Sequence, residues 1–193
     1  MWCIAHKVEL TIKDALKGTA FDLIDDMLKL YYMYEKSPEK CRQLEEIICD
    51  LKDCLKFDDK GIKPVQASGS RWVTHRLKAM KHVISKYEAY ISHLISLSED
   101  STIKAHDRAQ LKGCSNKWEY ILGCAFITDL LSPCATFSKS LRSDDLDVRT
   151  AFTNLLKTVK EINRFTSFTL EYWPTYSSIL KNIAQDGNDY VYQ

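Results

Sequence analysis

RWVTHRLKAMKHVISKYEAYISHLISL, residues 71 to 97, is the stretch that decides the fold class. Apolar side chains recur in it every three or four residues, which is the spacing of one buried side of an α-helix. These side chains belong to Val73, Leu77, Met80, Ile84, Tyr87, Ile91 and Leu94. The pattern predicts one helix from about Arg71 to Leu97, long enough to span the molecule.

The same periodicity covers most of the chain, and no stretch alternates cleanly in the manner of a half-buried strand. Gly18 and Pro133 are expected to bend or break the helices that contain them. We therefore expect a mainly α protein, a helical bundle with little or no β-sheet, whose end beyond Trp173-Pro174 is frayed. Further helices are predicted over residues 7–34, 38–55, 103–111, 116–141 and 148–162, with a loop over 57–70.

Composition is that of a folded chain, because 45% of the 193 residues are hydrophobic and only 6 are Gly and 4 Pro. The 27 basic and 26 acidic residues nearly cancel, so any nucleic-acid contact must come from a local basic patch. Seven cysteines without a CxxC pair are typical of a reducing compartment. With no signal peptide and no membrane-length apolar run evident, we expect a soluble intracellular protein without a membrane partner.

Cys3 and His6, in CIAHKVEL near the N-terminus, have the spacing of half a metal site. A structural zinc site needs four ligands, and no second pair follows at ligand spacing. Asp22, Asp25 and Asp26 share one side of a predicted helix, where solvated charge is the commoner explanation. The sequence thus predicts no metal site.

The segment SGSRWVTHRLKAMKH, residues 68 to 82, has more specific features. Arg71 at the start of a helix places a guanidinium beside free backbone N–H groups, an arrangement suited to a phosphate. Trp72 could stack on an unpaired base, and His75 and Lys78 continue a polar side of basic character. The alternative is that Trp72 packs into the core and the basic side is only solvated surface, which spacing alone favours.

No common catalytic motif occurs, but two stretches together resemble a known family. CIAHKVEL followed by SRWVTH, and then LLSPCATFSKSLRSDDLDVRTAF at residues 130 to 152, is similar to the middle of hAT-superfamily transposases and their domesticated descendants. The resemblance covers most of the chain. It implies that residues 1–34 are the edge of an RNase H-like core running into a long helix, and that residues 35–193 form the helical insertion domain.

Within this resemblance, Cys3 and His6 correspond to the Cys-x-x-His motif near the active centre, not to zinc ligands. Arg71 and Trp72 correspond to the Arg-Trp pair, whose tryptophan helps hold hairpin DNA in active relatives. The resemblance, together with the basic side of the predicted helix, leads us to expect a nuclear protein that binds hairpin or single-stranded DNA through Arg71, Trp72, His75 and Lys78.

The acidic residues that hold two metal ions in complete family members have no assignable counterparts here. We therefore expect a catalytically inactive protein with no cofactor, where complete members use Mg²⁺. Two alternatives stay open: a protein-interaction scaffold, which includes self-association or dimerisation and predicts an exposed apolar patch, and a fragment of a longer active transposase.

Overall fold

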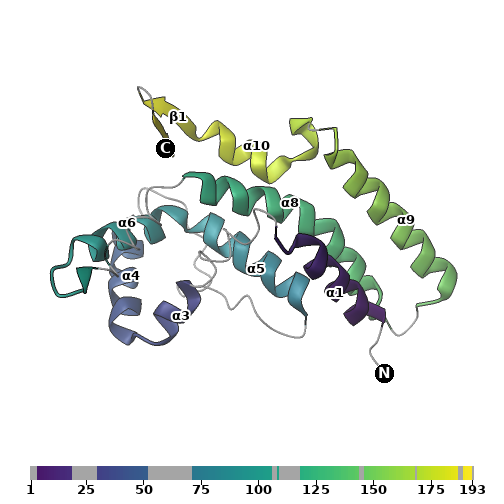
Figure 1. The fold of residues 1–193 in the computed structure, drawn as a ribbon, viewed down its shortest axis with the longest axis horizontal. Coiled ribbons are helices and arrows are strands. Elements are labelled where there is room, and N and C mark those ends of the chain that lie inside the picture. The colour runs from purple at the N-terminus through teal and green to yellow at the C-terminus, as the bar shows by residue number, and fades with distance from the viewer. Residues whose placement is uncertain are drawn as a thin grey trace.

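The computed structural model describes residues 4–18, 30–51, 71–105, 108, 118–143, 146–167, 169–186 and 189–192. Over this part of the chain the fold is mainly helical with one short antiparallel hairpin, which confirms the predicted fold class (Figure 1). The helices are α1 (Ile4–Leu16), α3 (Leu30–Glu35), α4 (Pro38–Leu51), α5 (Trp72–Ser85), α6 (Tyr87–Glu99), α8 (Trp118–Ser140), α9 (Val148–Phe165), the 3₁₀ turn η1 (Leu170–Tyr172) and α10 (Pro174–Lys181). The hairpin pairs β1 (Ile183–Asp186) with β2 (Asp189–Tyr192).

Helix α8 is the centre of the fold, and α1, α5, α9 and α10 all pack against it. Apolar residues all around this helix explain its position, because a helix without a polar face is stable only when it is covered. Helix α8 continues through Pro133, so the proline does not divide the helix, because packing on several sides outweighs the one backbone hydrogen bond that proline removes. Its fully buried residues include Ile121, Cys124, Ala125 and Leu131.

Helix α8 also passes a test of length and composition for a membrane span, over Tyr120–Ser140, although no such segment was expected from the sequence. In the fold, 67% of that apolar window is buried against other helices. A core helix meets the same criteria, so the observation is weak evidence for a membrane.

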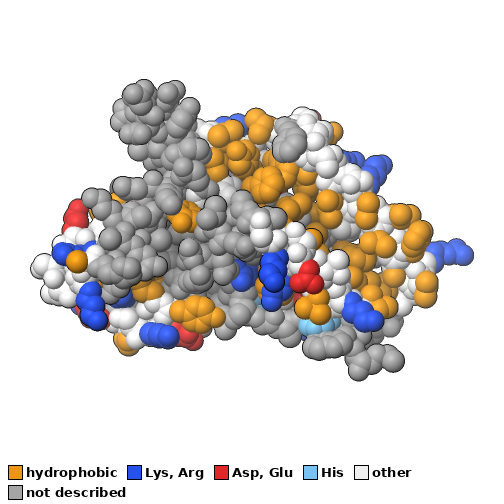
Figure 2. Space-filling view, in the orientation of Figure 1, with side chains coloured by type: hydrophobic (Ala, Val, Ile, Leu, Met, Phe, Trp, Pro, Cys, Tyr) orange, Lys and Arg blue, Asp and Glu red, His pale blue; other side chains and the backbone are white. Residues whose placement is uncertain are grey.

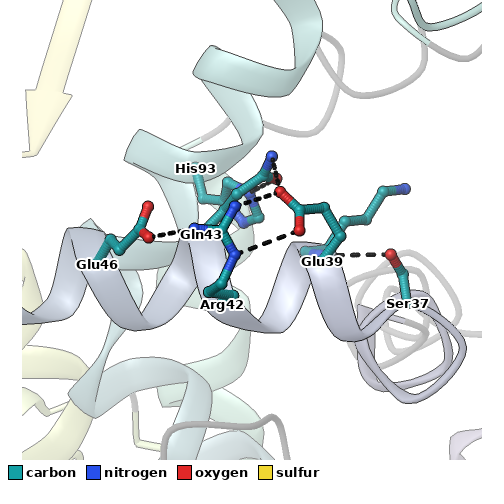
Figure 3. A network of polar contacts seen from close by, with 7 residues as sticks. Ser37, Glu39, Arg42, Gln43, Glu46 and His93 are labelled. Carbon is teal, nitrogen blue, oxygen red and sulfur yellow. Dashed lines mark hydrogen bonds and ion pairs between the residues drawn. The ribbon is translucent and has the colours of Figure 1, made fainter.

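A second group of helices forms around α6, which packs against α4, and α4 in turn packs against α3. Tyr34 and His93 are both buried between these helices, and the Tyr34 hydroxyl donates to His93 Nδ1 at 2.9 Å. The other ring nitrogen, Nε2, donates to Gln43 Oε1 at 3.2 Å (Figure 3). Burial and, to a smaller extent, the nearby Lys40 charge together lower the pKa of His93 to about 4, so this histidine is a neutral part of the core.

Two helices are shorter than predicted. The helix expected over 7–34 ends at Leu16, and Gly18 has a φ of +76°, a conformation that glycine adopts without strain. The helix expected over 71–97 is divided at Lys86, whose φ and ψ of −128° and 22° are not helical. Because α5 packs on α8 while α6 packs on α4, the division lets each half face its own neighbour.

The chain beyond Trp173-Pro174 is not frayed as predicted, because it forms α10 and the hairpin. The buried carboxylate of Asp129 on α8 accepts the backbone N–H groups of Thr175 at 3.1 Å and Tyr176 at 2.9 Å. Trp173 stacks on Phe126 of α8, with ring centroids 4.4 Å apart. The segment lacks a hydrophobic periodicity of its own, so these tertiary contacts with α8 are what hold it in place.

Helix α9 begins where the sequence predicted. Asp147 is its N-cap, and its carboxylate accepts the Thr150 N–H at 2.7 Å. That backbone hydrogen bond, together with one from the Thr150 hydroxyl, lowers the pKa of Asp147. The predicted loop over 57–70 and the predicted helix over 103–111 fall largely outside the described residues.

Candidate interaction surfaces

The first predicted motif is only partly within the described residues, because Cys3 lies outside them. His6 is on α1 and is half-buried. In the part of the chain that the structure describes, no three His, Cys, Asp or Glu side chains gather in a manner that could hold a metal ion. Asp22, Asp25 and Asp26 lie outside that part.

Glu9, three residues after His6, is the polar residue that fixes α1 to α8. It is 2% exposed, its Oε1 accepts a hydrogen bond from the Ser138 hydroxyl at 2.7 Å, and it forms an ion pair with Arg142. Arg142 also donates to the Ser138 hydroxyl at 2.9 Å. Sequence analysis did not single out Glu9, although its place between Ala5 and Ile12 on the apolar side of α1 could have drawn attention to it.

The second motif lies at the start of α5, which packs against both α1 and α8. Arg71 is exposed and is the residue just before the helix, and its carbonyl accepts the His75 N–H at 3.0 Å. Trp72 is half-buried and packs against the core, and the Arg76 guanidinium lies 5.5 Å from its ring centroid. The indole is thus partly covered by the protein itself.

The predicted basic side of α5 separates into two parts. His75 is half-buried, whereas Lys78 and Lys81 are exposed like Arg71. Helix α5 contains no acidic residue, so its solvent-facing side is basic along its length. The structure therefore places Arg71 and Lys78 on one accessible side, and it places Trp72 and His75 at the boundary with the core.

The most unusual surface belongs to α9, whose apolar side is open to solvent. Val148 is 87% exposed, Phe152 59% and Leu156 54%, and Leu155 and Val159 are exposed as well. Figure 2 shows hydrophobic side chains gathered over α9 and its surroundings. The sequence predicted this amphipathic helix and its apolar side. It did not predict that, among the described residues, so much of this side would be left uncovered.

A groove of about 320 Å³ lies between α1 and α9, with α8 as its floor. Cys134 and Phe137 of α8 form the floor, and almost all the accessible lining is apolar. Its walls are Ile4, Lys7, Val8, Thr11 and Ile12 of α1 and Leu155, Thr158, Val159 and Ile162 of α9. The groove continues into the open apolar side of α9, because Leu155 and Val159 belong to both.

Comparison of the chain with protein-family models, with curated proteins and with solved structures gives no match.

Proposed function

We propose that this protein is a non-catalytic helical interaction module that docks a helix of a partner protein on the surface formed by α1, α8 and α9. Its ancestry in this proposal is the hAT transposase insertion domain, on the resemblance given above, and its place of action is the nucleus.

The observation that carries the proposal is the exposure of Val148, Phe152 and Leu156 next to an apolar groove. Large apolar side chains that cluster on a surface mark sites of protein contact, whereas scattered ones do not. A groove between two helices with a third as its floor is the shape that an amphipathic helix fills.

The energetics favour Phe152 as the main anchor. Full burial of one large apolar side chain is worth about 1.5–3 kcal/mol, and aromatic residues dominate the binding energy of many interfaces. Phe152 is the largest of the exposed side chains on α9 and lies between Val148 and Leu156 along the helix. A partner side chain in the groove would add contacts with Cys134 and Phe137.

The test is a titration of ¹⁵N-labelled protein with a designed amphipathic helical peptide carrying leucines at i, i+3, i+4 and i+7. We expect chemical-shift changes confined to α1, α8 and α9, and their loss in the double variant Phe152→Glu, Leu156→Glu. The control is Ile95→Glu, which places one glutamate on an exposed apolar position of α6, at the other end of the molecule (Figure 1). Shifts elsewhere, or equal loss in the control, would contradict the proposal.

A second candidate function, DNA binding, is favoured by the acid-free exposed side of α5. Arg71, Lys78 and Lys81 can contact phosphates, while the partial burial of Trp72 makes stacking on a base the weaker part of the earlier hypothesis. It predicts binding of hairpin DNA that weakens as salt rises and that falls in Arg71→Ala, Lys78→Ala. In this function Trp72→Ala lowers folding stability more than DNA affinity, and the absence of binding at low salt would remove the candidate.

A further inference from the structure

We infer that the occupant of the α1, α8 and α9 surface is an amphipathic helix with acidic flanks from a different protein, and not a second copy of this chain. The inference rests on the proposed function and adds the charge and identity class of the partner. It comes from the distribution of basic residues at the two edges of the apolar surface.

The first basic edge belongs to α9. This helix carries four basic residues, at positions 149, 157, 160 and 164, against the single acidic residue Glu161. At about 100° of turn per residue, Arg149 and Lys160 fall beside Leu156 on the helix surface. Both are exposed, and among the described residues neither forms an ion pair. In Figure 2 Lys and Arg side chains border the hydrophobic area over α9.

The other edge, on α1, has the same sign. Lys7 is exposed and lines the groove beside Ile4, which is itself 70% exposed. Of the two acidic residues of α1, Glu9 is buried and already paired with Arg142, so it does not offset Lys7 for a partner. Asp14 is exposed but does not line the groove, and it stands two turns along the helix from Lys7. An occupant of the groove therefore meets a cation on each side.

These edges disfavour a second copy as the occupant. In an antiparallel two-fold pair, the Arg149 and Lys160 edge of one α9 faces the same edge of the other. In a parallel pair that edge faces the Lys7 edge. Like charges oppose in both arrangements, whereas glutamates or aspartates flanking the apolar residues of a partner helix would be complementary.

The length of the surface fixes the size of the partner helix. From Val148 to Val159 the apolar side of α9 spans twelve residues, a rise of about 16 Å or three turns. A partner helix of three to four turns, with apolar anchors at i, i+3 or i+4, and i+7, covers it. Acidic residues on both flanks of that stripe reach Lys7 on one side and Arg149 and Lys160 on the other.

The experiment compares two synthetic helical peptides with identical apolar anchors, one flanked by glutamates and the other by lysines. Affinity for the full chain is measured by fluorescence anisotropy at two salt concentrations. We expect the glutamate peptide to bind about tenfold or more tightly at low salt, with the preference shrinking as salt rises. The double variant Arg149→Glu, Lys160→Glu should reverse the preference, and the matched control Lys36→Glu, Lys104→Glu, at exposed lysines away from the groove, should keep it.

Other outcomes are distinguishable. Equal binding of the two peptides, abolished by Phe152→Glu, would overturn the acidic partner and leave the docking function intact. Binding of neither peptide would overturn both. A concentration-dependent dimer in sedimentation that Phe152→Glu dissociates would overturn the inference in favour of a second copy.

Discussion

Helices α8 and α9 follow one another in the chain and are both rich in apolar residues, yet one is enclosed and the other is open. Leu131 of α8 is completely buried, with α5, α9 and α10 among the neighbours of its helix. Phe152 of α9 is mostly exposed, because α9 touches the rest of the fold mainly through α8. The difference teaches that the pattern of apolar residues specifies which side of a helix needs cover, but not what covers it.

The largest expected contrast is in stability. Leu131→Ala removes a side chain with no exposed surface and leaves a cavity, so we expect a loss of about 2–5 kcal/mol in the free energy of unfolding. Leu156→Ala on α9 should change it by less than about 0.5 kcal/mol, because the side chain is already half in water. Urea unfolding of the two variants measures both values. Equal losses of stability in the two variants would mean that the apolar side of α9 is covered in solution, and they would contradict the contrast between the two helices.

A second contrast concerns pH and the core beneath α6. His93 is neutral in the fold with a pKa of about 4, against an ordinary value of 6.5, so the unfolded chain binds the proton first as pH falls. Stability from this group is complete above pH 6.5 and falls between pH 6.5 and 4, by about 2 kcal/mol once solvent screening is allowed for. The urea midpoint of the native chain should therefore fall as the pH is lowered from 6.5 to 4.

The variant His93→Gln should flatten that decline, at the expense of some stability at neutral pH from the lost ring contacts with Tyr34. A decline that His93→Gln leaves unchanged would assign the pH dependence to another group.

A third contrast compares two aspartates that cap helices. Asp129 is buried and accepts hydrogen bonds from two N–H groups of α10. The variant Asp129→Ala leaves these two partly buried donors without the carboxylate and should cost about 1–3 kcal/mol. Asp147 caps its own helix at an exposed position, and Asp147→Ala should cost less, because water can replace the carboxylate. Thermal unfolding compares the loss of stability in the two variants. A larger loss for Asp147→Ala would mean that α9 depends on its cap more than α10 depends on the buried carboxylate of α8.

Much of the fold follows from the sequence, because helices with strong local signals form where those signals stand. Asp147 before the apolar stripe of α9 and Pro38 at the start of α4 both mark helix starts that the structure confirms. The division at Lys86 could not be predicted, because no glycine or proline marks it and the cause is the different neighbours of α5 and α6. For the same reason α10, held by Asp129 from another helix, was missed.

The candidate site was less predictable than the fold. Arg71 and Lys78 are accessible as expected, but spacing could not tell that Trp72 would be half covered by the core and by Arg76. The apolar side of α9 was visible in the periodicity, yet its exposure depends on where α1 and α8 end up. Exposure is a tertiary property, so the surface that carries the proposed function became visible only in the fold.

The smallest expected energetic effect, and the most direct probe of the comparison, is thiol reactivity on the two helices. Cys124 on α8 is completely buried, and burial raises the pKa of its thiol to about 12, so it should resist alkylation by iodoacetamide at pH 8. A cysteine introduced by Leu156→Cys on α9 should react at the rate of an exposed thiol while changing stability little. Mass spectrometry of the digested protein follows both sites in one sample, with the exposed native Cys49 as internal standard. Binding of the acidic peptide should then slow alkylation at position 156 and leave Cys49 unaffected, because position 156 lies under the docked helix whereas Cys49 is on α4, away from it. Slow reaction at position 156 in the free protein would show that its apolar side is already covered.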